Sequence, residues 1–257
     1  MNKWVKRIAG SLLGLYLLAL TVLYFSQETF FFNGSPLPED YLFRDGEEVE
    51  LEVAEDIFLN CLLIDEPTDK GVILYLHGNK GSNSRCLRQV KMFEDLGYDL
   101  FMPDYRGYGK SDGKMTSQKQ AYSDVQVVYD HLEQQYGEAN IVILGYSLGS
   151  AMASHLAAHN NPKSLHLVAP FLSLTHMKDK FVPVIPDFLI KYPFSNKANL
   201  KEVNCPVTLY HSHEDELIPY QHSEDLVISN KVIQLINLPG AGHRGSIFHS
   251  AVRANIE

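Results

Sequence analysis

A serine flanked by glycines, placed between an apolar run and a helix-forming stretch, restricts the fold of this chain more than any other feature. Residues 145–149 read Gly-Tyr-Ser-Leu-Gly, follow the apolar run 141–144 and precede the alanine-rich stretch 150–158. Short apolar runs of this kind are typical of buried strands. A buried strand, a tight turn and a helix in this order predict an α/β architecture, with the Ser147 oxygen raised at the end of the strand.

Beyond residue 45 the chain alternates short β-rich runs with helical stretches. This pattern is typical of a mostly parallel sheet with helices on both faces, and we expect one domain over residues 45–257. Residues 170–206 break the pattern with five prolines and an apolar stretch at 181–192, which predicts a short lid insertion. The expected strands are 49–53, 57–64, 72–77, 100–103, 141–146, 165–169, 207–211 and 232–238, and the expected helices are 84–96, 117–136, 148–158 and 220–229.

The N-terminal segment has a different character. Residues 8–25 carry no charge and follow Lys3, Lys6 and Arg7. As a helix this run would be about 27 Å long, close to the hydrocarbon thickness of a bilayer. A cleaved signal peptide is the main alternative and a buried soluble helix the weaker one, but no small-x-small cleavage site follows the run. We therefore expect an uncleaved membrane anchor over residues 1–27 and a linker over residues 28–44.

The charges around this run predict its orientation. Basic residues precede it, whereas Glu28, Glu39 and Asp40 are the first charges after it. This distribution places the N-terminus in the cytoplasm and the domain on the extracytoplasmic side of a membrane crossed once. The aromatic residues 30–32 are expected at the level of the lipid headgroups, and residues 33–36 in a turn.

Charge and cysteine content exclude several kinds of partner. The chain has 22 basic and 31 acidic residues and a net charge of -9, so we do not expect it to bind nucleic acid. Cys61, Cys86 and Cys205 lack the spacing of a zinc ribbon or a dithiol motif, and we expect three buried thiols. His211 and His213 imitate metal ligands without a convincing third ligand. No cofactor and no metal are expected.

Ser147 needs a base, and the base needs an acid to orient it, before the hydroxyl can act as a nucleophile. In strand-turn-helix proteins of this kind the partners follow in the order Ser, Asp or Glu, His. Asp215 follows the expected strand 207–211, and His243 lies in a glycine-rich loop after the last strand, at the same sheet edge as Ser147. Glu214 and Glu216 flank Asp215 and remain alternatives for the acid.

Backbone N–H groups are expected to stabilise negative charge that develops next to the serine. Leu148 supplies one because it follows the serine, and Asn79 supplies the other from the loop 77–81 after the first buried strand. Gly78 is expected to allow close approach to this loop. The loop 105–113 is expected to shape an acyl pocket or to pack beside the loop 77–81.

Five motifs follow one another along residues 45–257: HGN at 77–79, DYRGYGKSDG at 104–113, GYSLG at 145–149, the acid in HEDELIP and the histidine in GAGH. Together they resemble the α/β-hydrolase superfamily, and within it the small membrane-tethered abhydrolase-domain serine hydrolases. The resemblance implies action on acyl esters and thioesters, including lipids and lipidated proteins. It also implies a nucleophile, its acid and base partners and an oxyanion hole, which are Ser147, Asp215 with His243, and Asn79 with Leu148.

The expected function is therefore a serine hydrolase that cleaves a lipid-like or acylated substrate through an acyl-serine intermediate. Acyl transfer or peptide hydrolysis on the same fold, and a non-catalytic binding protein, are the alternatives. Dehalogenases and epoxide hydrolases of this fold carry aspartate at the position of Ser147 and are excluded. Arg244 departs from the family pattern, in which asparagine often follows the histidine.

Overall fold

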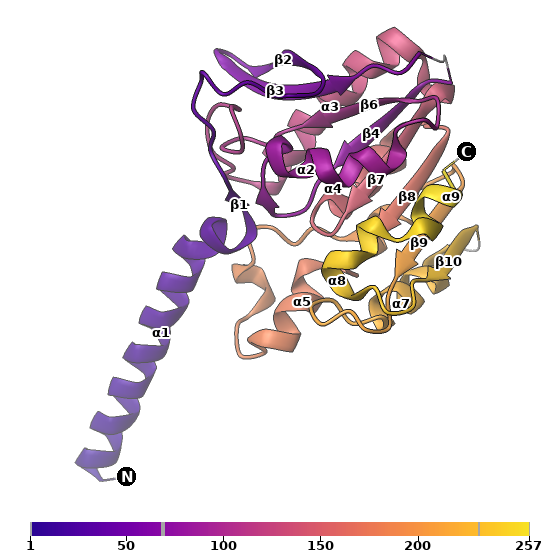
Figure 1. Ribbon diagram of the computed structural model, residues 1–257. Coiled ribbons are helices and arrows are strands. Elements are labelled where there is room, and N and C mark those ends of the chain that lie inside the picture. Colours follow the sequence, from indigo (N-terminus) through magenta and orange to yellow (C-terminus); the bar gives the residue numbers. More distant parts are fainter. Residues whose placement is uncertain (1, 68–69, 231, 257) are drawn as a thin grey trace.

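A long N-terminal helix and an α/β domain make up the chain in a computed structural model that describes residues 2–67, 70–230 and 232–256 (Figure 1). The ranges expected from the sequence also include residues 1, 68, 69, 231 and 257, which lie outside the described residues. The α-helices are α1 (Lys3–Phe31), α2 (Asn83–Val90), α3 (Gln118–Tyr136), α4 (Gly149–His159), α5 (Leu174–Phe181), α6 (Asn196–Asn199), α7 (Gln221–Ser229), α8 (Gly242–Gly245) and α9 (Ser250–Ala254). Short 3₁₀ helices are η1 (Lys91–Phe93), η2 (Glu138–Asn140), η3 (Asp187–Leu189) and η4 (Ser246–Phe248).

The strands of the described chain form one large sheet and one small ladder. The large sheet has eight strands in the order β10-β9-β8-β7-β4-β6-β3-β2. In this sheet β2 pairs antiparallel with β3, and β3 pairs antiparallel with β6. The other neighbouring strands pair in parallel. A separate parallel ladder joins β1 to β5. The strands are β1 (Asn33–Gly34), β2 (Glu47–Ala54), β3 (Ile57–Ile64), β4 (Val72–Leu76), β5 (Lys80–Gly81), β6 (Asp99–Pro103), β7 (Ile141–Tyr146), β8 (Ser164–Val168), β9 (Val207–His211) and β10 (Ile233–Asn237).

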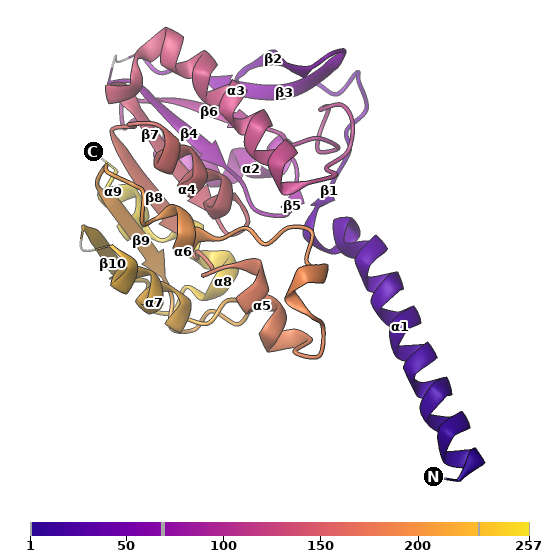
Figure 2. The same ribbon diagram turned by 180° about the vertical axis from the view of Figure 1, so that it is seen from behind.

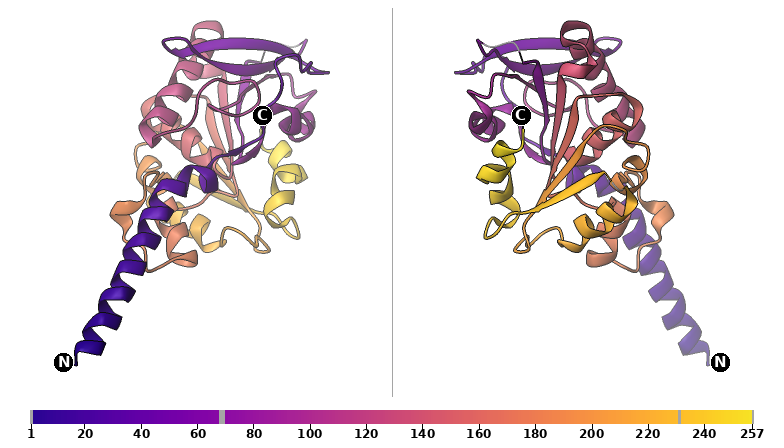
Figure 3. Two further views of the ribbon diagram at one scale, coloured as in Figure 1. Left: turned by 90° about the vertical axis from the view of Figure 1, so that its left-hand side faces the viewer. Right: turned by 90° about the vertical axis from the view of Figure 1, so that its right-hand side faces the viewer.

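Buried side chains fill both faces of the sheet, because successive residues of a strand point to opposite sides. In β4, Leu74 packs into the core cluster that also contains side chains of α3 and α4, whereas Ile73 and Tyr75 pack into the cluster that contains side chains of α2 and α9. Figure 2 shows α3, α4 and α7 on one face, and Figure 1 shows α2, α8 and α9 on the other. The edge-on views in Figure 3 show the sheet between these two layers. The expected mostly parallel sheet with helices on both faces is confirmed.

Most expected elements are found, with small differences at their ends. The expected helices at 117 and 148 start one residue later, because Ser117 and Leu148 are the residues that precede the first helical turn. The expected helix 84–96 is shorter and consists of α2 followed by η1. It ends before Asp95, which takes a left-handed backbone conformation with φ of 64°. Cys61, Cys86 and Cys205 are buried thiols, as expected.

Helix α1 extends further toward the domain than the apolar run predicts. It ends at Phe31, and its 29 residues correspond to about 43 Å at the usual helical rise. In the described chain it is the one helix long and apolar enough to cross a membrane. Its N-terminal part projects away from the domain (Figure 3).

The end of α1 and the residues after it contact the domain. Phe31, the last residue of α1, and Phe32 make edge-to-face contacts with Tyr192. The expected position of residues 30–32 at the level of the lipid headgroups stays a prediction. Asn33 and Gly34 form β1 instead of the expected turn. Because β1 pairs with β5, the end of α1 is joined to the loop after β4.

The insertion at residues 170–206 contains α5, η3 and α6 and adds no strand to the sheet within the described residues. Its end is fixed to α4 through the buried side chain of Asn196. This amide donates to the Ser150 hydroxyl and the Phe171 carbonyl oxygen at 2.9 and 2.7 Å, and accepts from Ser154 at 2.7 Å. The insertion is therefore attached directly behind the turn that carries Ser147.

Candidate active site

Ser147 lies in a crowded turn between β7 and α4. Its φ of 52° is in the left-handed region, which non-glycine residues adopt rarely. A Cβ atom at Gly145 would lie 2.6 Å from the Ala153 Cβ atom, and one at Gly149 would lie 1.9 Å from the Leu76 carbonyl oxygen. Both glycines are therefore required for close contact of the strand and the helix. The turn directs the Ser147 side chain to the edge of the sheet where the β strands end.

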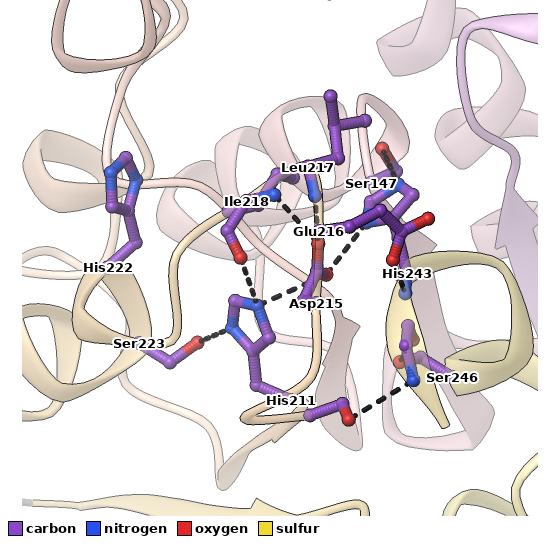
Figure 4. A network of polar contacts seen from close by, with 12 residues as sticks. Ser147, His211, Asp215, Glu216, Leu217, Ile218, His222, Ser223, His243 and Ser246 are labelled. Atoms are coloured by element: carbon purple, nitrogen blue, oxygen red, sulfur yellow. Dashed lines mark hydrogen bonds and ion pairs between the residues drawn. The ribbon is translucent and has the colours of Figure 1, made fainter. Parts of the chain in front are cut away.

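The structure brings Ser147, His243 and Asp215 together (Figure 4). The Nε2 atom of His243 lies 3.1 Å from the Ser147 hydroxyl oxygen, and its Nδ1 atom lies 2.8 Å from the Asp215 Oδ2 atom. His243 lies in the short helix α8 after β10, rather than in the expected glycine-rich loop, and Asp215 follows β9. This arrangement allows the imidazole to take a proton from the serine while the carboxylate holds the ring.

Hydrogen bonds keep the Asp215 carboxylate ionised and in place. Its Oδ1 atom accepts the backbone N–H groups of Leu217 and Ile218 at 2.9 and 2.7 Å. Burial raises the pKa of Asp215, but hydrogen bonds from His211 and His243 outweigh burial and hold this pKa well below its ordinary value. Asp215 is therefore negatively charged in the range where histidines titrate.

The acidic neighbours of Asp215 hold the loop that carries His243. Glu216 accepts the backbone N–H of His243 at 2.9 Å, and Glu214 accepts the backbone N–H of Gly240 at 3.1 Å. Neither carboxylate is the partner of the His243 ring. Between the alternatives that the sequence leaves open, the geometry favours Asp215.

His211 is a member of this network that the sequence does not identify. Its Nε2 atom lies 3.3 Å from the Asp215 carboxylate and 3.0 Å from the Ile218 carbonyl oxygen, while Nδ1 contacts the Ser223 hydroxyl at 2.6 Å. His213 instead stacks on the ring of Tyr220. The signal in the sequence is the spacing of four residues between His211 and Asp215, which places both at the end of one strand.

Asn79 and Leu148, whose backbone amides are expected to form an oxyanion hole, line one cavity together with Ser147. Within the described residues, the backbone N–H groups of Asn79 and Leu148 donate no hydrogen bond to the protein. The Asn79 carbonyl oxygen accepts the Asn33 N–H and the Tyr108 hydroxyl, both at 3.0 Å, which fixes the loop. The loop 105–113 thus packs beside the loop 77–81.

A Cβ atom at Gly78 would lie 3.4 Å from the Tyr146 ring, which is ordinary van der Waals contact, so the packing of the loop does not require glycine here. The expected role of Gly78, which is to allow close approach to this loop, stays a prediction.

Two cavities meet at Ser147, and both also include Asn79. The first has a volume of about 540 Å³ and is lined almost wholly by apolar side chains of α1 and of residues 171–190. The second has a volume of about 410 Å³, is more polar and includes His243. We call them the apolar cavity and the polar cavity. Neither lining contains aspartate or glutamate among the described residues.

Comparisons with known proteins agree with this architecture. The lysophosphatidylserine lipase ABHD12 of Danio rerio is 29% identical over 176 residues, which are 60% of this chain and 46% of that protein. The Xenopus tropicalis protein of the same name is 28% identical and covers 72% of this chain and 51% of its own length. The chain thus spans about half the length of these curated relatives. Alpha/beta hydrolase domain-containing protein 17C of Mus musculus is 27% identical, with 79% of this chain and 65% of that protein covered.

Solved structures share the fold at low sequence identity. The Pyrococcus furiosus esterase Pf2001 superposes with a TM-score of 0.67 at 20% identity, covering 87% of this chain and 96% of the esterase. Est1E from Butyrivibrio proteoclasticus, solved with ferulic acid, superposes with a TM-score of 0.66 at 19% identity. The superposition covers 80% of this chain and 96% of Est1E. Residues 67–198, slightly more than half of this chain, match the family described as serine aminopeptidase, S33. The chain therefore belongs to the serine aminopeptidase S33 family of α/β-hydrolases.

Proposed function

We propose that the protein is a membrane-anchored serine hydrolase that cleaves acyl esters of lipid-like substrates. The hydrogen-bonded series from Ser147 through His243 to Asp215 is the observation that carries this proposal. The names of the relatives, which include a lipase, and an apolar cavity beside the serine support an ester with a long acyl chain. Thioesters have the same acyl chemistry and belong to the same proposal.

In the first half of the reaction, the Ser147 oxygen bonds to the acyl carbon while His243 takes the hydroxyl proton. The N–H groups of Asn79 and Leu148 stabilise the negative charge on the carbonyl oxygen. The bond between the acyl carbon and the leaving oxygen then breaks, and His243 gives its proton to that oxygen. An acyl-serine and a free alcohol result.

In the second half, water replaces the serine. His243 takes a proton from the water while the water oxygen bonds to the acyl carbon. The bond between the acyl carbon and the Ser147 oxygen then breaks. The Ser147 oxygen recovers a proton from His243, and a carboxylic acid leaves. Acyl transfer follows the same steps with an alcohol in place of water, so analysis of the products distinguishes the two reactions.

Peptidase activity is the second candidate, since the family description names a serine aminopeptidase. An aminopeptidase must bind the positive N-terminal ammonium group of its substrate, and a carboxylate near the serine is the usual partner for such a charge. Neither cavity at Ser147 is lined by an acidic side chain in the described chain. This lining favours ester hydrolysis over aminopeptidase activity.

Helix α1 contributes a wall of the proposed acyl site. Its residues that line the apolar cavity recur at helical spacing on one face and are Leu20, Leu23, Tyr24, Gln27, Phe30 and Phe31. Hydrogen bonds at two positions along α1 attach the helix to the insertion 170–206. Gln27 donates to the Leu189 carbonyl oxygen at 2.7 Å, and Tyr16 donates to the Val184 carbonyl oxygen at 2.7 Å.

These contacts imply a route for the acyl chain. Tyr16 lies in the middle of the apolar run, about 14 Å along the helix from Phe25 at the usual rise. The insertion therefore accompanies α1 into the apolar layer of a membrane, where the exposed side chains of Val184 and Phe188 contact lipid. An acyl chain can pass from the bilayer along α1 to Ser147 without crossing water.

The domain boundaries and the topology are part of the proposal. Residues 1–27 form the membrane anchor, and residues 28–44 form the linker to the hydrolase domain. This domain comprises residues 45–257 and includes the lid at about 170–206. The basic residues before the apolar run and the acidic residues after it support an extracytoplasmic domain.

Replacement of Ser147 by alanine should lower the turnover of a p-nitrophenyl ester on the order of 10³-fold or more, because only the nucleophilic oxygen is removed. Steady-state assays of the full chain in detergent measure this loss. Circular dichroism of the variant should match that of the wild type. A variant that keeps more than about a tenth of the activity would rule out Ser147 as the nucleophile.

Asp215→Asn should reduce turnover on the order of 10³-fold, because the amide stabilises the wrong tautomer of His243. Glu214→Gln and Glu216→Gln are the matched controls, and each should cost less, because these acids contact backbone N–H groups. A larger loss of turnover in either control than in Asp215→Asn would show that Glu214 or Glu216, and not Asp215, orients His243.

The same variant has a predicted effect on stability. Because the pKa of Asp215 is lower in the folded chain than the ordinary value of about 3.9, its charge stabilises the fold above that pH, and this contribution is lost as the pH falls through the folded pKa. The difference in thermal midpoint between wild type and Asp215→Asn should therefore be constant above about pH 5 and shrink below about pH 4.

Leu23→Trp should reduce hydrolysis of long-chain esters relative to short-chain esters, because the indole occupies volume in the apolar cavity. The ratio of kcat/KM for a C16 ester to that for a C4 ester should fall on the order of tenfold. Leu18→Trp is the control, since Leu18 is on the opposite face of α1, is exposed and does not line the cavity. If Leu23→Trp and Leu18→Trp had the same ratio of kcat/KM values, α1 would not be part of the acyl site.

Protease added to intact cells should digest the hydrolase domain, because the charges around α1 place it outside. Immunoblotting with an antibody against the C-terminal half measures the loss. Protection in intact cells, followed by digestion after permeabilisation, would reverse the orientation.

A further inference from the structure

A short segment after α1 attaches this helix to the loop after β4. It comprises residues 33–37 and begins with β1, and we call it the junction segment. The Asn33 N–H donates to the Asn79 carbonyl oxygen at 3.0 Å, and the Ser35 N–H donates to the Gly81 carbonyl oxygen at 2.8 Å. Figure 2 shows β1 and β5 side by side at the end of α1. The segment is therefore bonded directly to the residue whose amide is expected in the oxyanion hole.

The junction segment is packed just as closely on its other side. The Leu37 N–H donates to the Gly109 carbonyl oxygen at 2.8 Å. A Cβ atom at Gly34 would lie 2.8 Å from the Gly107 carbonyl oxygen and 2.8 Å from the Tyr108 ring, which is closer than van der Waals contact allows. Only glycine therefore fits at this position, and the segment is held between two loops.

The Asn79 carbonyl oxygen is the point at which these two loops and the junction segment meet. It accepts the Tyr108 hydroxyl from the domain and the Asn33 N–H from the junction segment, both at 3.0 Å. Only two backbone dihedral angles separate the C=O and N–H groups of Asn79, so a displaced carbonyl carries the amide with it. An oxyanion donor acts only within about 3 Å of the oxygen on which charge develops. The bonds on the carbonyl therefore determine whether the amide reaches that oxygen.

Helix α1 holds the junction segment from its other end. The helix ends at Phe31, two residues before Asn33. In its last turn, the Glu28 carboxylate accepts the Lys191 ammonium at 2.9 Å and the Tyr192 hydroxyl at 3.0 Å. The position of Asn33 is therefore set by α1 and by the lid insertion, and not by the loop after β4 alone.

We propose that the junction segment positions the oxyanion amide of Asn79, so that the end of the membrane anchor contributes to the chemistry and not only to attachment. This inference rests on the proposed ester hydrolysis and adds a positioning element to it. In the described chain, none of residues 33–37 lines either cavity at Ser147. The segment therefore acts on the transition state through Asn79, and we expect it to affect kcat and not the binding of the ester.

Two substitutions in the full chain disturb this contact in different ways. Gly34→Ala adds a methyl group against the Tyr108 ring, and Asn33→Pro removes the N–H donor. Gly14→Ala is the matched control, because a Cβ atom at Gly14 of α1 would have no neighbour within 4 Å beyond the backbone of its own helix. The values of kcat and KM for p-nitrophenyl butyrate are measured in detergent, and the thermal midpoint shows that each variant is folded at the assay temperature.

Gly34→Ala and Asn33→Pro should each lower kcat on the order of tenfold or more with an unchanged KM, because a misplaced amide loses only transition-state stabilisation. Gly14→Ala should match the wild type in both values. A wild-type kcat in both junction variants would overturn this inference and leave the ester hydrolysis standing. Absence of hydrolysis by the wild-type chain would instead overturn the proposed function and this inference with it.

A pair of inhibitors distinguishes a displaced amide from a damaged cavity. When a long-chain trifluoromethyl ketone binds, the Ser147 oxygen bonds to the ketone carbon, His243 takes the hydroxyl proton, and the ketone oxygen becomes negative beside the oxyanion amides. The methyl ketone of the same chain length occupies the cavity without this step. Both junction variants should bind the trifluoromethyl ketone on the order of tenfold more weakly and the methyl ketone unchanged. Equal weakening for the two ketones would contradict the inference, because it indicates loss of the cavity.

Discussion

The turn at Ser147 is the constraint on which the rest of the site depends. A non-glycine residue with φ of 52° is strained, and the strain is maintained because β7 and α4 approach so closely that only glycine fits on either side. The same turn places Ser147 and Leu148 in the lining of one cavity. The position of the proposed nucleophile is thus a consequence of strand-helix packing.

The partners of the serine are held by a second set of contacts that is also part of the fold. Asp215 is fixed by two backbone N–H groups of its own turn and by His211 at the end of β9. The loop of His243 is fixed by Glu214 and Glu216, which follow the same strand. One short segment after β9 therefore holds in place both Asp215 and His243, the proposed acid and base.

Features with a local sequence signal could be predicted, and features made by distant contacts could not. The buried strands β4, β7 and β9 follow from apolar runs, and the positions of Ser147 and Asp215 follow from where those runs end. The ladder of β1 with β5 has only two residues in each strand and no apolar pattern, so it depends on the docking of α1. The expected strand 207–211 matches β9, but the contact of His211 with Asp215 also depends on the turn at 212–215, in which the Asp215 N–H donates to the Ser212 carbonyl oxygen. A strand pattern does not specify that turn.

Acylation of Ser147 is the central claim, and mass spectrometry after treatment with a fluorophosphonate tests it most directly. The full chain should gain the mass of one phosphonyl group, and digestion should locate the adduct on the peptide that contains Ser147. Prior incubation with a long-chain acyl ester should slow the labelling, because both reagents use the same hydroxyl. An adduct on another serine, or no adduct on a folded chain, would contradict the account.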